Sequence, residues 1–179
     1  MQIKDNVIVQ SFKEHSEIKK ELLDRIYNTK AGKYRAVSHT DWFTGGDVPR
    51  TYFSDILEPL VRHYYKNIFK HYYKEQAEHM DLAIDNHWFQ IYKKNSTHEW
   101  HTHACCNLAN VYYVSLPDKK IKTQFINVDG LDIKEGDLVT FPAYYLHTSP
   151  INNDDSEKVI ISFNTNVSVR KDVFNPTTY

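Results

Sequence analysis

The spacing of apolar residues along the chain changes once, near residue 82. Before that point, two stretches carry apolar residues every three or four positions, which is typical of one face of a helix. The first covers residues 18–27, behind a segment at 11–14 that resembles a capping box, and Gly32 stands where a helix stop would fall. The second covers residues 57–73, with Pro59 in its first turn. We expect two helices whose apolar faces pack on a sheet.

After residue 82 the period becomes two, which predicts β-strands. In residues 88–92, Trp88, Gln90 and Tyr92 fall on one face of a strand, and Phe89 and Ile91 fall on the other. An Asp-Gly pair at 129–130 predicts a hairpin turn. Further strands are expected at residues 101–103, 110–116, 121–128, 131–133, 136–147 and 158–167. Two helices followed by about eight short strands indicate an α+β, mainly β fold around a closed or sandwiched antiparallel sheet.

The remaining long segment, residues 34–53, shows no sustained period. It contains Trp42, two adjacent glycines and Pro49. We expect an irregular connection that folds over a site as a lid. With 179 residues, the chain is predicted to form one domain, 1–179, with helical N-terminal support in 1–80 and a β-barrel core in 82–167.

Composition narrows the function only a little. The net charge of -1 and the pI near 6.8 favour neither nucleic acid nor an anionic membrane as the main partner. The first residues do not resemble a signal peptide, and no apolar run has the length of a membrane span. Cys105 and Cys106 are adjacent, which is poor geometry for a disulfide, and we interpret them as reduced thiols used in packing. These features predict a cytoplasmic protein, and homo-oligomer formation stays open.

The candidate chemistry begins with His101 and His103. Two imidazoles at positions i and i+2 of a strand point to the same side, so both can reach one metal ion. A third member is available at His147, which follows a glycine-led turn, an apolar strand and a proline. Five other histidines have no partner at metal-ligand spacing and are expected to be ordinary polar residues: His15, His39, His63, His71 and His79.

These motifs, taken in order, resemble those of the Fe(II)- and 2-oxoglutarate-dependent dioxygenases. The matching pieces lie within residues 86–166: Trp-His-Thr-His at 100–103, Val-Tyr-Tyr to Pro at 111–117, Gly-Asp-Leu-x-x-Phe-Pro at 136–142, His147, and Ser-Phe-Asn at 162–164. The resemblance implies a double-stranded β-helix, or jelly roll, with prolyl-hydroxylase-like barrel strands and iron at its open end. It also implies that His101, His103 and His147 are the Fe(II) ligands and catalytic residues.

The same resemblance implies a set of residues that bind 2-oxoglutarate. Tyr113 and Lys158 stand where the family holds the far carboxylate, and Tyr92 and Trp88 lie on the strand that lines the pocket. Period two places Lys158, Ser162 and Asn164 on one face of their strand. A cation, a hydroxyl and an amide are costly to bury without a partner, and an anionic ligand would satisfy them. The alternative is that this face is exposed to solvent.

Two residues depart from the family pattern. The second metal ligand is usually Asp or Glu, whereas this chain has His103, and Lys158 replaces the usual arginine. Three neutral imidazoles leave the metal one charge more positive, and a lysine lacks the bidentate fork of an arginine. Glu99 lies two residues before His101 and is an alternative carboxylate ligand, although the family pattern favours His103.

The resemblance implies an oxygenase that oxidises 2-oxoglutarate to succinate and CO2 with O2 while it hydroxylates a substrate. That substrate is either a residue of another protein or a small metabolite, and no motif selects one. Two alternatives remain open. One is a three-histidine cupin-type dioxygenase that does not use 2-oxoglutarate, although the cupin glutamate is absent between residues 104 and 110. The other is a non-catalytic jelly-roll module that binds a metal or a partner.

Overall fold

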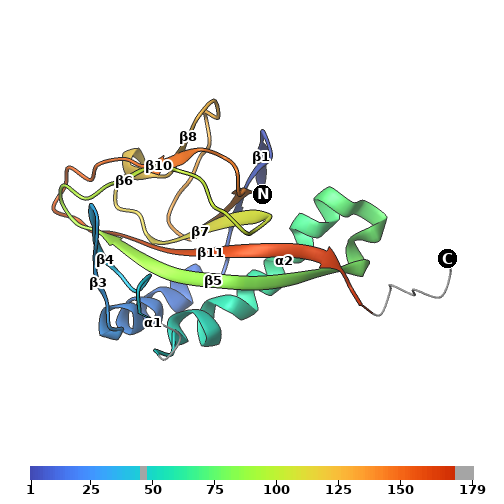
Figure 1. The fold of residues 1–179 in the computed structure, drawn as a ribbon, viewed down its shortest axis with the longest axis horizontal. Helices are drawn as coiled ribbons and strands as arrows, with labels where there is room; N and C mark the ends of the chain where they lie inside the picture. Colours follow the sequence, from blue (N-terminus) through green and yellow to red (C-terminus); the bar gives the residue numbers. More distant parts are fainter. Residues whose placement is uncertain (45–47, 172–179) are drawn as a thin grey trace.

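Two antiparallel sheets lie above a layer of helices in the computed structural model, which describes residues 1–44 and 48–171 (Figure 1). The larger sheet contains, in spatial order, β1 (Gln2–Lys4), β2 (Val7–Ser11), β9 (Asp137–Pro142), β7 (Leu108–Ser115), β11 (Lys158–Val169), β5 (Met80–Tyr92), β4 (Val37–Thr40) and β3 (Gly32–Tyr34). The smaller sheet contains β6 (His98–His101), β10 (His147–Ser149) and β8 (Gln124–Phe125). This arrangement confirms the predicted jelly roll.

Both predicted helices are present and cover one face of the larger sheet. They are α1 (His15–Asn28) and α2 (Glu58–Tyr73), and α2 is preceded by the π-helical turn η1 (Tyr52–Leu57) and followed by the 3₁₀ turn η2 (Lys74–His79). Their apolar stripes pack on the side chains of β5, β7 and β11. This buried layer includes Leu22, Ile26, Val61, Tyr65, Ile68, Phe89, Ile91, Tyr112, Ile161 and Phe163. The prediction that the helical stripes serve as core is confirmed. No helix of the described residues is both long and apolar enough to cross a membrane.

The long pair β5–β11 sets the alternation on which the site depends. Ser162 lies opposite Trp88, and Lys158 lies opposite Tyr92. One face of each strand belongs to the helix-packed layer, so the other face turns toward the smaller sheet. There Lys158, Ile160, Ser162 and Asn164 have exposed fractions of 0%, 3%, 3% and 6%. The alternative that this face of β11 meets solvent is therefore wrong.

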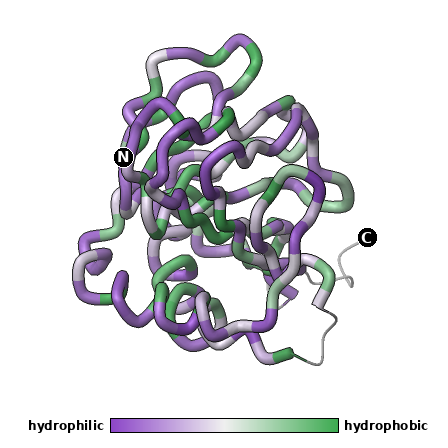
Figure 2. The backbone as a smooth tube through the Cα atoms, turned by 90° about the vertical axis from the view of Figure 1, so that its left-hand side faces the viewer, coloured by the Kyte–Doolittle hydropathy of each residue, from purple (hydrophilic) through white to green (hydrophobic). Residues whose placement is uncertain are grey.

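A second apolar layer fills the space between the two sheets. Figure 2 shows hydrophobic segments running through the middle of the fold, with hydrophilic segments along the outer loops. This layer includes Tyr92, Val111, Tyr113, Ile121, Phe125, Leu131, Ile133, Phe141 and Ile160. Because the layer is apolar, each polar side chain that points into it needs a partner or a ligand.

Several local predictions were wrong. Ser11 does not cap α1, because it ends β2 and donates a hydrogen bond to the Asp137 carboxylate at 2.6 Å. The helix begins at His15 without a side-chain cap and ends at Asn28, and Gly32 begins β3. The N-terminal 80 residues also supply β1 to β4, which the helical spacing did not indicate. Pairing of β2 with the distant β9 and of β4 with the distant β5 overrides the local signal.

The region between residues 119 and 133 also differs from its prediction. The expected strand at 121–128 is reduced to the 3₁₀ turn η3 (Lys119–Ile121) and the two-residue β8, and residues 131–133 form no strand. The hairpin turn predicted at 129–130 is wrong: the tight turn lies at residues 126–127, between the bridged Phe125 and Val128, although Gly130 does have a positive φ of +72°. Leu131 and Ile133 alternate because both are buried as loop residues in the layer between the sheets. Alternating burial therefore arises here without strand pairing.

The segment at 34–53 is only partly irregular. It contains the end of β3 and all of β4, which pairs with β5 through His39–Ile91 and Thr40–Gln90. Residues 45–47 lie outside the described residues. The expectation that the segment forms a lid stays a prediction.

Candidate metal centre

Three histidines meet where the smaller sheet covers the larger one. His101 ends β6, His103 follows it, and His147 begins β10, directly opposite His101 in the β6–β10 pair. One ring nitrogen from each lies within 4.8 Å of the others. The ring centroids of His101 and His147 are 4.2 Å apart, and those of His103 and His147 are 5.2 Å apart. The structure therefore brings the three predicted ligands together.

A carbonyl oxygen orients each of the three rings. The Nδ1–H of His101 donates to the Glu99 carbonyl at 2.8 Å, and that of His147 donates to the Tyr145 carbonyl at 2.9 Å. The Nδ1–H of His103 donates to the Asn164 side-chain oxygen at 2.6 Å. These oxygens only accept, so each Nε2 keeps its lone pair for a metal ion.

The environment also keeps the three rings neutral. Burial lowers the pKa of His147 to about 3, and burial likewise lowers the pKa of His101 and of His103. A neutral imidazole is the form that ligates a metal. Three oriented, neutral imidazole nitrogens fit a divalent first-row transition-metal ion.

Glu99 lies outside this group. Its side chain is 62% exposed and forms an ion pair with Arg35. Only its backbone carbonyl contacts the group, by accepting the hydrogen bond from His101. Cys105 is exposed and Cys106 half-buried, both with free thiols, so the predicted packing role does not hold for Cys105. In the described part of the chain, the group of side chains that could hold a metal ion therefore consists of the three histidines alone.

Lys158 is the most unusual residue near the three histidines. Its side chain is completely buried, and its ammonium donates hydrogen bonds to the Ile121 carbonyl at 2.6 Å and to Ser149 Oγ at 2.7 Å. Desolvation lowers its pKa to about 7. Among the described residues, no carboxylate lies within ion-pair distance of this ammonium. Burying a cation without an acid partner is costly, and a bound anion would offset this cost.

Aromatic rings and hydroxyl groups enclose the ammonium. Its Nζ lies 4.7 Å from the ring centroid of Tyr92 and 5.9 Å from that of Tyr113. The Tyr113 hydroxyl donates to Thr123 Oγ1 at 2.7 Å and accepts from the Thr123 backbone N–H at 2.9 Å. Tyr92, Thr123 and Ser149 line a narrow cavity that leads to the three histidines. Its free space of about 20 Å³ holds roughly one water molecule.

The other predicted cofactor residues lie around this cavity, and each has a partner within the protein. Trp88 stacks over His103, with 5.9 Å between the ring centroids. Asn164 orients His103, and Ser162 donates to the Gln90 side-chain oxygen at 3.2 Å. Trp88 and Ser162 line the cavity, whereas Asn164 lies on the outer side of the metal group.

Sequence reasoning gave no role to His98. It lies in β6, and its ring stacks on that of His101 with 4.0 Å between the centroids. The Gln90 side-chain amide donates to His98 Nδ1 at 3.2 Å. The spacing of His98 and His101 gave no signal, because residues three apart point to opposite faces of a regular strand.

A wider cavity of about 460 Å³ opens on the outer side of the three histidines. Tyr34, Arg35, Trp42, Asn86 and Trp88 form much of its wall. Trp42 and Trp88 meet edge to face at 4.3 Å between ring centroids. The cavity has the size of ordinary ligand sites and makes the metal group accessible from outside.

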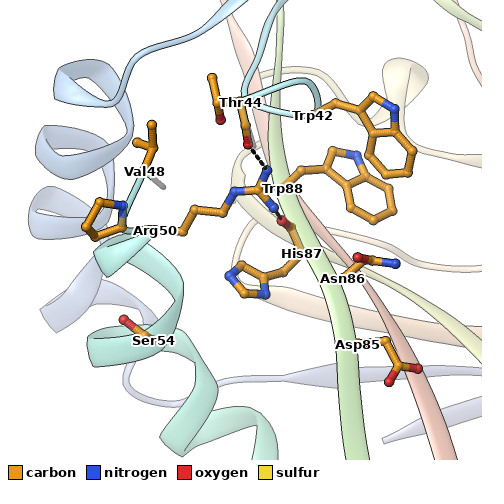
Figure 3. Close-up of a pocket in the computed structure, with 10 residues that line it drawn as sticks. Trp42, Thr44, Val48, Arg50, Ser54, Asp85, Asn86, His87 and Trp88 are labelled. Carbon is orange, nitrogen blue, oxygen red and sulfur yellow. Dashed lines mark hydrogen bonds between the residues drawn. The ribbon is translucent and has the colours of Figure 1, made fainter. Parts of the chain in front are cut away.

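A second outer cavity of about 650 Å³ shares the Trp42 and Trp88 walls (Figure 3). Arg50 crosses it and donates to the carbonyls of His87 and Thr44. Its Nε also pairs at 3.0 Å with the fully buried Asp41 carboxylate. Because these partners occupy the guanidinium, Arg50 fastens the segment that carries Trp42 and is not available to a ligand.

The chain has the double-stranded β-helix fold that is found in solved structures of 2-oxoglutarate- and Fe(II)-dependent oxygenases. No family model and no curated relative matches this chain. Among solved structures, it is similar to an oxidoreductase of the 2OG-Fe(II) oxygenase family from Burkholderia pseudomallei, with TM-score 0.65 and 8% identity over 90% of this chain and 84% of the other.

Two further structures show the same likeness. The viral collagen prolyl hydroxylase of Paramecium bursaria Chlorella virus-1, in its 2OG complex, has TM-score 0.60 and 15% identity over 92% of this chain and 97% of its own. HygX from Streptomyces hygroscopicus, with nickel, 2-oxoglutarate and hygromycin B bound, has TM-score 0.59 and 9% identity over 90% and 82%. The fold expected from the sequence motifs is confirmed.

Proposed function

We propose that this protein is an Fe(II)- and 2-oxoglutarate-dependent oxygenase. The observation that carries the proposal is the buried Lys158 ammonium, which has no acid partner among the described residues and lies near the cavity that leads to three neutral imidazoles. A dianion that ligates a metal at one end and carries a carboxylate at the other satisfies both features. The 2-oxoglutarate named for the viral hydroxylase and for HygX has this chemistry.

In this proposal His101, His103 and His147 hold the iron. Lys158, Ser149 and the Tyr113–Thr123 pair bind the far carboxylate of 2-oxoglutarate. Iron and 2-oxoglutarate, when bound, supply the chemistry by which O2 and 2-oxoglutarate become succinate and CO2 while one oxygen atom is inserted into a substrate C–H bond. The protein orients the reactants and excludes water from the cavity. The substrate occupies the outer cavity beside Trp42 and Trp88.

A second candidate function is a three-histidine metal dioxygenase that does not use 2-oxoglutarate. Two observations favour it. The metal group contains His103 where a carboxylate is usual, and the inner cavity has free space for only about one water molecule. Binding of 2-oxoglutarate therefore requires rotatable side chains, such as those of Trp88 and Lys158, to move apart.

Turnover of 2-oxoglutarate separates the two candidates. Purified protein is incubated with Fe(II), ascorbate, O2 and 2-oxoglutarate, and succinate is measured, with His147→Ala as the inactive control. The proposal predicts slow, iron-dependent succinate formation even without the outer substrate. Succinate that forms equally in His147→Ala, or no succinate from iron-loaded protein, contradicts the proposal and favours the second candidate.

A further inference from the structure

We infer that His98 is a fixed N–H donor to the metal-binding end of 2-oxoglutarate and is kept from acting as a fourth metal ligand. The inference rests on the proposed function for the identity of the anion. It concerns a fourth imidazole that lines the inner cavity beside the three metal-ligating histidines.

The orientation of the Gln90 side-chain amide in the structure indicates which nitrogen of His98 carries the proton. Ser162 Oγ donates to Gln90 Oε1 at 3.2 Å, which leaves the Gln90 amide nitrogen facing His98. That nitrogen donates to His98 Nδ1 at 3.2 Å. Since an amide nitrogen cannot accept, Nδ1 is the acceptor, and the proton of the neutral ring lies on Nε2.

This proton position distinguishes His98 from its neighbours. In His101, His103 and His147 the Nδ1 atom donates to an oxygen, so Nε2 is free to ligate a metal. In His98 the order is reversed, because Nδ1 accepts and Nε2 holds a proton. A ring in this state has no free lone pair for the metal, although it stacks on His101 at 4.0 Å.

The place of His98 indicates what its N–H binds. The ring lines the inner cavity, and it also borders the outer one. The far carboxylate of 2-oxoglutarate is assigned to Lys158, so the end left near the four imidazoles is the 2-oxo acid. A third neutral histidine in place of a carboxylate leaves the net charge of the metal and its ligands one unit more positive. A neutral donor such as His98 does not change this net charge. A hydrogen bond from the His98 N–H to this end of the anion would leave the net charge of the site unchanged.

Two variants of His98 test the inference through binding and not through turnover. Anaerobic affinity for 2-oxoglutarate is measured by calorimetry on metal-loaded protein, and metal content is measured separately. His98→Leu is expected to weaken 2-oxoglutarate binding about tenfold with an unchanged metal content. His98→Gln keeps an N–H donor and is expected to retain most of the affinity. His39→Gln, at an exposed strand position, serves as the matched control.

The proton position itself is read by long-range ¹H–¹⁵N NMR of the zinc-loaded protein, in which His98 is expected as the Nε2–H form and Gln90→Leu is expected to lose this preference. An Nδ1–H form of His98, or loss of metal in His98→Gln, overturns the inference. Unchanged 2-oxoglutarate affinity in His98→Leu also overturns it, while the proposed function stands if Lys158→Met abolishes binding. If the wild-type protein binds no 2-oxoglutarate, the proposed function fails and this inference fails with it.

Discussion

Replacing Lys158 by methionine tests the claim that its ammonium is buried without an acid partner when no anion is bound. Methionine keeps the length and the apolar stem of the side chain and removes the charge. Burial lowers the pKa of Lys158 from 10.5 to about 7. The shift corresponds to a cost of at most about 5 kcal/mol for holding the charged lysine in the ligand-free fold. Loss of the hydrogen bonds to Ile121 and Ser149 offsets part of the gain, by about 1–3 kcal/mol for each acceptor left unpaired.

The pH dependence isolates the charge from these hydrogen bonds. Below pH 7 the lysine is protonated in the folded and the unfolded chain, so the full cost is present. Between pH 7 and pH 10.5 only the unfolded chain holds the proton, and the cost falls as pH rises. The free energy of unfolding of Lys158→Met minus that of the wild type should therefore decrease by about 3 kcal/mol from pH 7 to pH 9.5.

Urea unfolding of the metal-free proteins at several pH values gives this difference in the free energy of unfolding. The control is Lys93→Met, because Lys93 is half-exposed and pairs with Glu157, and its difference from the wild type should not change in this way with pH. A difference that does not change with pH refutes the reasoning, because it means that Lys158 is solvated or paired with an acid in solution. The same variant should lose measurable 2-oxoglutarate binding.

Three further predictions follow from the contacts around the site. Asn164→Ala removes the oxygen that orients His103 and should weaken metal binding by about 10–100-fold in a chelator competition, and Asn166→Ala, on the same strand, should not. His103→Asp replaces an imidazole by a carboxylate that also ligates iron, so it should keep one bound metal where His103→Ala loses it; equal metal loss in both would show that His103 is not a ligand. Asp41→Asn leaves Arg50 without its buried carboxylate and should lower the free energy of unfolding, measured in urea, by about 3–5 kcal/mol. Asp132→Asn, at an exposed pair with Lys119, should leave the midpoint of urea unfolding unchanged. Similar midpoints for both variants would contradict the assigned role of Asp41.

The parts of the fold that the sequence predicted are those in which burial follows one regular period. The two helical stripes and the alternation of β5 and β11 are seen in the structure, because each element buries one face along its whole length. The strands β1 and β2 were missed because they are short, and β2 gains its place in the sheet from pairing with the distant β9. The opposite error occurred at Leu131 and Ile133, where alternating burial predicted a strand although these residues pair with no other strand.

The same distinction applies to the site. The i, i+2 spacing did single out His101 and His103, but the predicted strand at 101–103 is wrong, because β6 ends at His101 and His103 reaches the group from the loop that follows; His147 was found through the motif around it. The sequence left His103 and Glu99 as alternatives, and the structure pairs Glu99 with Arg35. Gln90 lies at the cavity because it shares its strand face with Trp88 and Tyr92, as the period of two indicates. His98 and Thr123 could not be found from the sequence, because no local spacing brings them to the cavity.

The most direct measurement is an anaerobic titration of the purified protein with Fe(II) and 2-oxoglutarate, followed by visible absorbance. The proposed function predicts a charge-transfer band that saturates at one 2-oxoglutarate per bound iron and is absent in His101→Ala and in Lys158→Met. The Lys93→Met control should show the full band. Tightly bound iron without a band in the wild-type protein would contradict the assignment of 2-oxoglutarate to this site.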